Sequence, residues 1–323
     1  MRRIFVYESL SGGGEVGSEA DAAALLPQGL AMRDAIVADL LRVPDLAVTC
    51  TVSDRAGASF ANPALSCVAA RAGESALAFV LRESRQHDLA WIVAPESDGL
   101  LAAMQTAVGA PRWVGCGAAA IRVASSKQAT LAALAARGVP TPRDDVAKAS
   151  ALRWVVKPDD GAGAMDTLVH RDHAAALADL HRREHAGAAA TLEPFIEGQA
   201  LSVTMLAGPG FVQPLAFNEQ QIVIAADGRL HYRGVRVNAI DARRDPRATR
   251  LHTLALDVQR ALPGLRGVVG FDLVWHAERG PLVIEVNPRV TCAYVGLSAA
   301  LGRNIAEEAL LLHSLPEHAD AAA

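Results

Sequence analysis

The amino-acid sequence predicts an α/β (α+β) protein that begins with a parallel α/β domain and continues into a largely antiparallel half. Up to about residue 110, short apolar runs alternate with helix-like stretches, which is the order of a parallel sheet wrapped by helices. Beyond about residue 200, runs of alternating apolar and polar residues follow one another closely, as antiparallel strands do. With 323 residues, 51% hydrophobic and 20% charged, the chain can bury a sizeable core.

The N-terminal domain is predicted to contain strands and helices in alternation. The predicted strands cover residues 4–7, 46–52 and 89–94, and the predicted helices cover residues 28–41, 75–85 and 99–108. Residues 95–98 contain polar side chains suited to capping the last of these helices. Glu8, Glu96 and Ser97 lie at the ends of predicted strands, where parallel sheets bind ligands. Ordinary polar loop residues explain these three positions equally well.

A glycine-rich segment follows the first predicted strand and raises one alternative function. Gly12, Gly14 and Gly17 match the G-x-G-x-x-G spacing of a dinucleotide site. Pro27 is expected to delay the next helix, so the glycines would not open it as they do in such sites. An NAD(P)-dependent oxidoreductase therefore stays an alternative, while a flexible substrate loop fits the segment better.

Lys127 indicates a phosphate-binding region in the middle of the chain. A helix is predicted from Lys127 to residue 137, with Ser125 or Ser126 as its cap and Gly138 at its end. A lysine in a first helical turn is locally unfavourable. An anion bound by the lysine and the backbone N–H groups would resolve this conflict. A solvated lysine is the simpler alternative.

Lys157 is a second candidate for phosphate binding. It ends the strand predicted over residues 152–157 and precedes a loop that contains Gly161 and Gly163. Glycines let backbone N–H groups approach phosphate oxygens, and the lysine adds a positive charge. The spacing is not that of a Walker A loop, and a tight hairpin turn is the alternative interpretation.

The second half of the chain is predicted to be rich in strands. Residues 171–185, 247–262 and 304–313 are predicted helices, and residues 201–206, 211–217, 220–224 and 230–233 are predicted strands. Before these strands, residues 191–198 contain Pro194, which cannot donate a hydrogen bond within a sheet, so this segment is predicted to be an edge strand or a linker. Its free backbone groups suit recognition of an adenine edge.

Residues 266–291 are predicted to form a β-hairpin with its turn at residues 277–280. If the hairpin is centred on the bond between residues 278 and 279, Asp272 faces Glu285 and Gly270 faces Asn287. Glu285 and Asn287 are two residues apart and therefore share one face of the second strand. The other face is predicted to be apolar, with Leu282, Ile284 and Val286.

This register predicts a metal site. Two carboxylates directly opposite each other, with Cβ atoms roughly 5 Å apart, repel one another. A divalent cation removes the repulsion, and Mg²⁺ typically binds one or two carboxylates together with substrate phosphates. The hairpin therefore predicts a phosphate-linked Mg²⁺ site, with two solvated carboxylates as the alternative.

Together, these motifs resemble the ATP-grasp superfamily from residue 125 to the end of the chain. The residues that carry the resemblance are Lys127, Lys157 with its glycine loop, Glu193, Pro194, Phe195, Ile196, Asp272, Glu285 and Asn287. The resemblance implies an ATP-grasp fold with an N-terminal parallel α/β domain of the preATP-grasp type. The implied domains are residues 1–112, residues 113–190 with Lys157 and the glycine loop, and residues 191–323 with the Mg²⁺ site.

The resemblance also implies a role for each candidate residue. Lys127 and Lys157 would contact ATP phosphates, Lys157 also near the adenine, and the loop of Gly161, Ala162 and Gly163 would close over the phosphates. Glu193 would bind the adenine amino group, and Pro194, Phe195 and Ile196 would complete adenine recognition. Asp272, Glu285 and Asn287 would hold one or two Mg²⁺ ions, with Mn²⁺ as an alternative. Arg289 and Lys157 are the implied catalytic residues, and Arg289 would face the transferred phosphoryl group or the carboxylate substrate.

Shorter motifs resemble a narrower group, the ligases related to tyramine–glutamate ligase of methanofuran biosynthesis. They lie at residues 4–9 with the following glycine loop, at residues 199–204 and at residues 218–220. This resemblance implies an ATP-dependent carboxylate–amine ligase that joins glutamate to an amine such as tyramine or tyrosine through an acyl-phosphate. One departure is Ala200, where many relatives have a ribose-binding glutamate. A non-catalytic ATP-binding regulator is a further alternative.

Composition argues against several other classes of protein. The net charge of −4 disfavours a nucleic-acid binder, and no apolar run reaches the length of a membrane span. The four cysteines have no C-x-x-C spacing, which fits free thiols in a reducing compartment. The first residues turn polar too soon for a signal peptide. The sequence therefore predicts a cytoplasmic protein that acts on small carboxylate and amine substrates, and it leaves a homodimer open.

Overall fold

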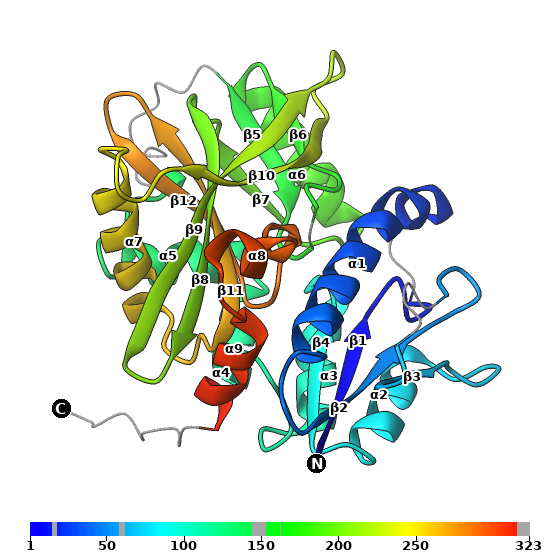
Figure 1. Cartoon of the computed structure of the whole chain (residues 1–323). Helices are drawn as coiled ribbons and strands as arrows, with labels where there is room; N and C mark the ends of the chain where they lie inside the picture. The colour runs from blue at the N-terminus through cyan, green and yellow to red at the C-terminus, as the bar shows by residue number, and fades with distance from the viewer. Residues whose placement is uncertain (15–17, 58–61, 144–152, 162, 315–323) are drawn as a thin grey trace.

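The computed structural model describes residues 1–14, 18–57, 62–143, 153–161 and 163–314. Within them lie a four-stranded sheet, a three-stranded sheet and a five-stranded sheet. Figure 1 shows the four-stranded sheet at the lower right, the five-stranded sheet at the left and the three-stranded sheet at the top. The predicted class, a parallel α/β domain followed by an antiparallel half, is confirmed.

The N-terminal sheet has the strand order β3-β2-β1-β4, and its strands run parallel. The strands are β1 (Arg2–Glu8), β2 (Leu46–Thr51), β3 (Leu65–Val68) and β4 (Leu89–Val93). The helices are α1 (Glu19–Leu40), α2 (Ala76–Ser84) and α3 (Leu100–Val108). The sequence does not predict β3, because its residues are half-buried or exposed at the sheet edge and form no apolar run.

Helix α1 begins earlier than the sequence predicts. Its first residue is Glu19, and Ser18 caps it, because the Ser18 Oγ accepts from the Asp21 N–H while the Asp21 carboxylate accepts from the Ser18 N–H. Pro27 lies inside the helix, where it removes one backbone donor. The expectation that Pro27 delays the helix is therefore wrong, since the cap and the alanines after it start the helix upstream of the proline.

Helix α3 also begins differently from the prediction. A short 3-10 helix, η1 (Ser97–Gly99), precedes it, and Asp98 and Gly99 have left-handed φ values of 55° and 67°. Gly99 occupies the N-cap position and no side chain caps the helix there, so the predicted capping by residues 95–98 is wrong. Glycine adopts this left-handed conformation without the strain that a Cβ atom would cause.

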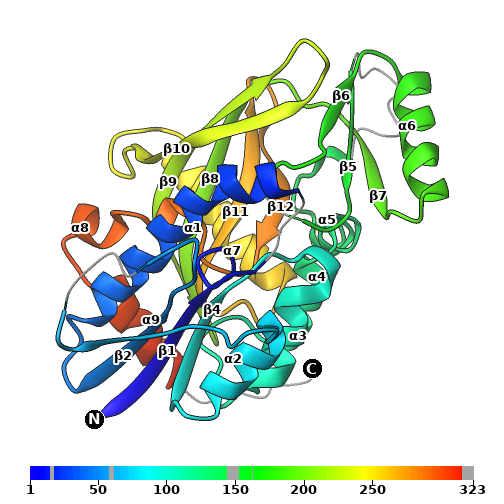
Figure 2. The same cartoon turned by 90° about the vertical axis from the view of Figure 1, so that its right-hand side faces the viewer.

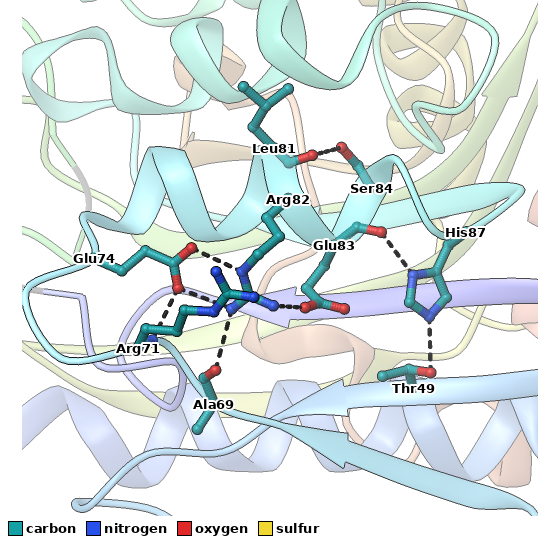
Figure 3. A network of polar contacts seen from close by, with 9 residues as sticks. All are labelled: Thr49, Ala69, Arg71, Glu74, Leu81, Arg82, Glu83, Ser84 and His87. Atoms are coloured by element: carbon teal, nitrogen blue, oxygen red, sulfur yellow. Dashed lines mark hydrogen bonds and ion pairs between the residues drawn. The ribbon is translucent and has the colours of Figure 1, made fainter.

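A polar network fixes α2 on the N-terminal sheet (Figure 3). The buried ring of His87 contacts the Glu83 carbonyl at 2.7 Å and the Thr49 Oγ1 at 2.9 Å. Arg82 lies between Glu74 and Glu83 and forms an ion pair with both. These contacts join α2 to β2 and give the parallel sheet a fixed outer layer.

The central part of the chain contributes helices and the three-stranded sheet. The helices are α4 (Ala118–Ala124), α5 (Lys127–Ala135) and α6 (His173–His185). The sheet has the order β6-β5-β7, with β5 (Trp154–Pro158), β6 (Leu168–His170) and β7 (Ala190–Pro194). Strand β7 lies at an edge of this antiparallel sheet, which confirms the edge position predicted from Pro194. The domain boundary expected after residue 190 falls inside β7.

The five-stranded sheet has the order β10-β9-β8-β11-β12 and is antiparallel. Its strands are β8 (Gln199–Gly208), β9 (Phe211–Ile224), β10 (Leu230–Ile240), β11 (Gly267–His276) and β12 (Gly280–Asn287). Helix α7 (Ala248–Ala261) packs on this sheet, and η3 (Cys292–Tyr294), α8 (Leu297–Leu301) and α9 (Ile305–His313) follow β12. The two strands predicted over residues 211–217 and 220–224 are one strand, because the polar residues between them stay paired with β8.

The predicted hairpin register is confirmed at the end that carries the candidate metal ligands. Asp272 pairs with Glu285, and Gly270 pairs with Asn287. A β-bulge between Asp272 and Leu273 then shifts the register by one residue toward the turn. Ile284 falls in this bulge, is only half-buried and lines a cavity, so the prediction that it fills the apolar face is wrong.

A shared apolar core joins the two large sheets. It runs from Phe5 in the parallel sheet through Leu101 and Ile121 to Val203 and Phe271 in the five-stranded sheet. Figure 2 shows α1 between these sheets, where it contacts β1 on one side and α9 and η3 on the other. No helix in the described part of the chain combines the length and apolar character needed to cross a membrane.

Candidate active site

A cavity of about 530 Å³ lies where the three sheets meet. It brings together every residue that the ATP-grasp resemblance implies for the site and that the structure describes. These residues are Lys127, Lys157, Gly161, Gly163, Glu193, Pro194, Phe195, Ile196, Asp272, Glu285, Asn287 and Arg289. Ala162, the remaining candidate, lies outside the described residues. Glu96 and Ser97 do not line the cavity.

Lys127 reaches the cavity from the start of α5. Ser126 is the cap of this helix, since its Oγ accepts from the Ala129 N–H at 3.1 Å. The backbone N–H groups of Lys127 and Gln128 donate to Asp159, at 2.8 and 2.9 Å. These N–H groups are therefore not available to an anion, contrary to the prediction. The Lys127 side chain does line the cavity, where its Nζ donates to the Gly161 carbonyl at 3.2 Å and lies 3.5 Å from the Glu285 carboxylate.

Lys157 and Glu193 form a buried ion pair on neighbouring strands. Residues of β5 and β7 are paired here, and the Lys157 Nζ lies 3.0 Å from the Glu193 Oε2. The Glu193 Oε1 is buried and has no hydrogen-bond partner among the residues that the structure describes. A buried acceptor without a donor is costly, so a ligand that donates a hydrogen bond fits this position. Phe195 continues the wall, with the Arg153 guanidinium 4.1 Å from its ring centre.

Asp272, Glu285 and Asn287 lie together at the far end of the hairpin. Burial, followed by the nearby charge of Glu285, raises the pKa of Asp272 well above its usual value. Burial would raise the pKa of Glu285 as well, but the charges of Lys127 and Lys157 lower it overall. Opposite shifts of this kind are those of two carboxylates that crowd one site.

The same three residues fit a hard divalent cation, because two carboxylates and an amide provide oxygen ligands. The Gln220 amide donates to the Asp272 Oδ1 at 2.8 Å, and the Asn287 amide lies 3.4 Å from the Asp272 Oδ2. No cluster of three or more His, Cys, Asp or Glu side chains suited to a metal occurs within the described ranges. Any ion held here therefore needs ligand oxygens from outside the protein to complete its shell.

Arg289 connects the hairpin to the N-terminal domain. Its Nη2 lies 2.9 Å from the Oε2 of Glu96, which follows β4, and both side chains are nearly buried. Arg289 lines the cavity, but Glu96 already neutralises its charge. The predicted ligand-facing edge of the parallel sheet thus forms one wall of the cavity.

The glycines of the N-terminal loop have a structural explanation. A Cβ atom on Gly12 would lie 2.6 Å from the Tyr7 ring, and one on Gly14 would lie 2.6 Å from the Ser9 Oγ. Close packing of the loop against β1 therefore requires both glycines. Gly17 lies outside the described residues.

Sequence reasoning did not assign the side chains that α1 and the β9–β10 ribbon contribute to the cavity. From α1 come Leu25, Gln28, Gly29 and Met32, and from the ribbon come Glu219, Ile222 and Tyr232. Periodicity does not distinguish cavity-facing from core-facing positions, which explains the omission. Gly29 in a helix interior is the one local signal that could have drawn attention to this wall.

Comparison with known proteins identifies the fold. Residues 124–293 match the ATP-grasp domain family, and residues 46–121 match the pre ATP-grasp 3 domain. The chain is similar to a provisionally assigned ATP-grasp superfamily protein from Archaeoglobus fulgidus, with 23% identity and a TM-score of 0.69 over 96% of this chain and 88% of that chain.

Two ligases of known structure are also similar. L-amino acid ligase from Bacillus licheniformis shares 16% identity, with a TM-score of 0.66 over 98% of this chain and 75% of that chain. D-alanine–D-alanine ligase from Bacillus anthracis shares 15% identity, with a TM-score of 0.65 over 97% and 99% of the two chains. At these identities the likeness shows the fold alone. A search of curated proteins finds no significant match. The match over residues 124–293 spans more than half of the 323 residues, and the chain therefore belongs to the ATP-grasp family.

Proposed function

We propose that this protein is an ATP- and Mg²⁺-dependent ligase that joins a carboxylate to an amine. The observation that carries the proposal is the pairing of Asp272 with Glu285 in a cavity that also contains Lys127 and Lys157. Two carboxylates that face each other favour binding of a divalent cation, and the lysines favour binding of anionic oxygens. A metal–triphosphate group provides both.

We infer that ATP binds with its adenine toward Glu193 and its phosphates toward the hairpin. The unpartnered Glu193 Oε1 suits the amino group of adenine, and Phe195 and Ile196 supply apolar surface next to it. Lys157 and Lys127 then lie along the phosphates, and the loop that contains Gly161 closes over them. Asp272, Glu285 and Asn287 would hold Mg²⁺, or Mn²⁺ in its place. When bound, the ion neutralises charge on the phosphates.

The chemistry requires positioning and charge stabilisation more than a nucleophilic side chain. The substrate carboxylate attacks the γ-phosphorus, a C–O–P link forms and the bond to ADP breaks. The amine then attacks the acyl carbon, the C–N bond forms, phosphate leaves and the amine loses a proton to solvent. Arg289, which is held by Glu96, would stabilise the negative charge that develops in both steps. The cavity walls limit hydrolysis of the acyl-phosphate by excluding water.

Glutamate is the proposed carboxylate, and an amine such as tyramine or tyrosine is the proposed acceptor, in the synthesis of a methanofuran-like cofactor. The motifs that suggest this group surround the acidic pair: Gln220 donates to Asp272, and Gln199 donates to Glu219 at 2.7 Å. Ile222 and Tyr232 give the cavity an apolar wall that suits an aromatic ring. Two of the similar structures are amino acid ligases, which agrees with the proposed reaction class.

ADP release in the presence of Mg²⁺-ATP, L-glutamate and a panel of amines tests the proposal, with products weighed by mass spectrometry. The expected result is ADP formation that depends on the amine, with a product heavier than the amine by one condensed glutamate. ATP binding without ADP formation for any pair would favour the regulator. Consumption of NAD(P)H, measured by absorbance, would favour the oxidoreductase.

A further inference from the structure

The N-terminal wall of the cavity contains an acidic side chain in an unusual environment, Glu8. It is the last residue of β1, is 3% exposed and lines the cavity. The turn after β1 fixes its carboxylate: Oε1 accepts from the Leu10 N–H at 3.1 Å, and Oε2 accepts from the Ser11 N–H at 2.8 Å. Each carboxylate oxygen can accept more than one hydrogen bond, so acceptor capacity remains.

Glu8 differs from the other buried acids of the described chain. The buried acidic residues are Glu8, Asp39, Glu83, Glu96, Asp179 and Glu193. Each of the others forms an ion pair with a lysine or arginine, whereas no ion pair among the described residues includes Glu8. Because a buried carboxylate without a cation is costly, its environment indicates a cationic partner from outside the chain.

The nearby cation Arg33 does not take this role. Its charge lowers the pKa of Glu8 slightly, but burial dominates and raises that pKa overall. The Arg33 guanidinium donates to the Thr51 carbonyl at 2.9 Å and to the Gly57 carbonyl at 3.1 Å, and it pairs with Asp34. These donors therefore contact the end of β2, the loop that follows it and Asp34.

Gly29 lets helix α1 pack directly against the Glu8 carboxylate. It lies in the interior of α1, where a glycine costs about 1 kcal/mol relative to alanine. Its backbone has no positive φ that would require glycine. A Cβ atom on Gly29 would lie 2.5–2.7 Å from the three carboxyl atoms of Glu8. The glycine is explained by close approach to this carboxylate, and both residues line the cavity.

The same wall meets the segment that follows the metal-binding strand. Gln28 precedes Gly29, and its Oε1 accepts from the Cys292 thiol at 3.4 Å. Thr291, Cys292 and Ala293 line the cavity beyond Arg289. A group bound at Glu8 therefore shares the cavity with the proposed phosphoryl-transfer site rather than occupying a separate pocket.

We infer that Glu8, against which Gly29 packs, is the binding subsite for the ammonium group of the amine substrate. This inference rests on the proposed ligase function and assigns the amine to the N-terminal wall. A carboxylate group is disfavoured there by charge repulsion, so the group that receives the phosphoryl is expected to bind elsewhere in the cavity. A metal ion is disfavoured because both carboxylate oxygens already accept backbone N–H groups and Glu8 belongs to no metal-binding cluster of acidic residues in the part of the chain that the structure describes.

Calorimetric binding tests the inference without turnover. The probes are two matched pairs, tyramine with 4-ethylphenol and L-tyrosine with 3-(4-hydroxyphenyl)propanoate, in the presence of Mg²⁺ and a non-hydrolysable ATP analogue. Each pair differs by one ammonium group. The wild-type protein is expected to prefer at least one amine over its partner by about tenfold or more, as a charge-assisted hydrogen bond implies.

Glu8→Gln is expected to abolish this preference, and Gly29→Ala to weaken it through the added methyl group. Glu83→Gln is the matched control, a buried acid of the same domain that contacts Arg82 away from the cavity. The thermal midpoint and the affinity for the ATP analogue show whether each variant is folded. If Glu8→Gln does not fold, the effect of Gly29→Ala on the ammonium preference tests the inference.

A preference that survives in Glu8→Gln and Gly29→Ala, or no preference for either amine in the wild-type protein, overturns the inference. The ADP assay separates this from failure of the proposed function. Amine-dependent ADP release with an unchanged preference refutes the subsite alone. An ammonium preference lost in Glu8→Gln but without ADP release refutes the ligase alone.

Discussion

The β11–β12 hairpin and the N-terminal wall line the same cavity, but they are built in different ways. In the hairpin, Asp272 and Glu285 face each other because two strands adjacent in sequence pair in one register. On the N-terminal side, Glu8 ends β1 and lines the cavity, while Glu96 follows the parallel strand β4 and contacts Arg289 across 193 residues of sequence. The difference indicates that the proposed metal site is encoded locally, whereas the proposed substrate side depends on how whole domains dock.

Glu285→Ala tests the local half of the comparison and has the largest expected effect. Turnover should fall by at least about 100-fold, because a group that stabilises transferring charge is lost. The free energy of unfolding should change little, since removal of Glu285 also relieves its repulsion with Asp272. ADP release and urea denaturation measure the two effects. Glu278→Ala, in the exposed turn of the same hairpin, is the control and should keep full activity. Full ADP release by Glu285→Ala would show that the hairpin holds no catalytic metal.

Glu96→Gln tests the long-range half and has an intermediate expected effect. Arg289 would keep a hydrogen bond but lose its counter-ion. We therefore expect about a tenfold lower kcat, with a loss of roughly 2 kcal/mol in the free energy of unfolding, less than the full removal of a buried partner costs. Steady-state kinetics measures the change in kcat, and urea denaturation measures the change in the free energy of unfolding.

Glu83→Gln removes the charge of a buried ion pair in the same domain but away from the cavity. It should lose stability while keeping its kcat. Equal kcat values for the two variants would mean that Glu96 contributes to stability only and does not position Arg289.

Ser126→Ala has the smallest expected effect. It compares a helix cap next to the cavity with a helix cap away from it. Loss of this helix cap should cost about 1 kcal/mol of stability. Ser75→Ala removes the equivalent cap of α2, where the Ala78 N–H donates to the Ser75 Oγ at 3.3 Å, and should cost a similar amount. Only Ser126→Ala should raise the KM for ATP, by about threefold, because Lys127 begins the helix that this cap fixes. An unchanged KM would separate the cap from the position of Lys127.

Local patterns predicted the elements that depend on neighbouring residues. The register at Asp272 and Glu285 follows from alternation and a short turn, and the edge position of Pro194 follows from its missing N–H. Where two local rules compete, the prediction was wrong. Pro27 suggests a helix start, but the capping box at Ser18 begins the helix upstream. Ile284 fits an apolar face by alternation, but a bulge turns it to the cavity.

The side chains of the N-terminal wall were beyond the reach of local rules. Glu8 ends a strand and Gly29 interrupts a helix, and each is unremarkable alone. Their relation appears only when α1 packs over β1 and places Gly29 against the Glu8 carboxylate. The hydrogen bonds that the first N–H groups of α5 donate to Asp159 are likewise tertiary contacts. The sequence around Lys127 does not predict them.

The contact between Glu96 and Arg289 also bears on how the protein is made. Contacts that close long stretches of chain form slowly, because the loss of chain entropy precedes the gain from the contact. During synthesis, the parallel sheet leaves the ribosome long before Arg289 exists. We therefore expect nascent chains that end before β12 to fold their first domain yet show no nucleotide-dependent protection from protease, with ligand binding appearing abruptly near the end of translation.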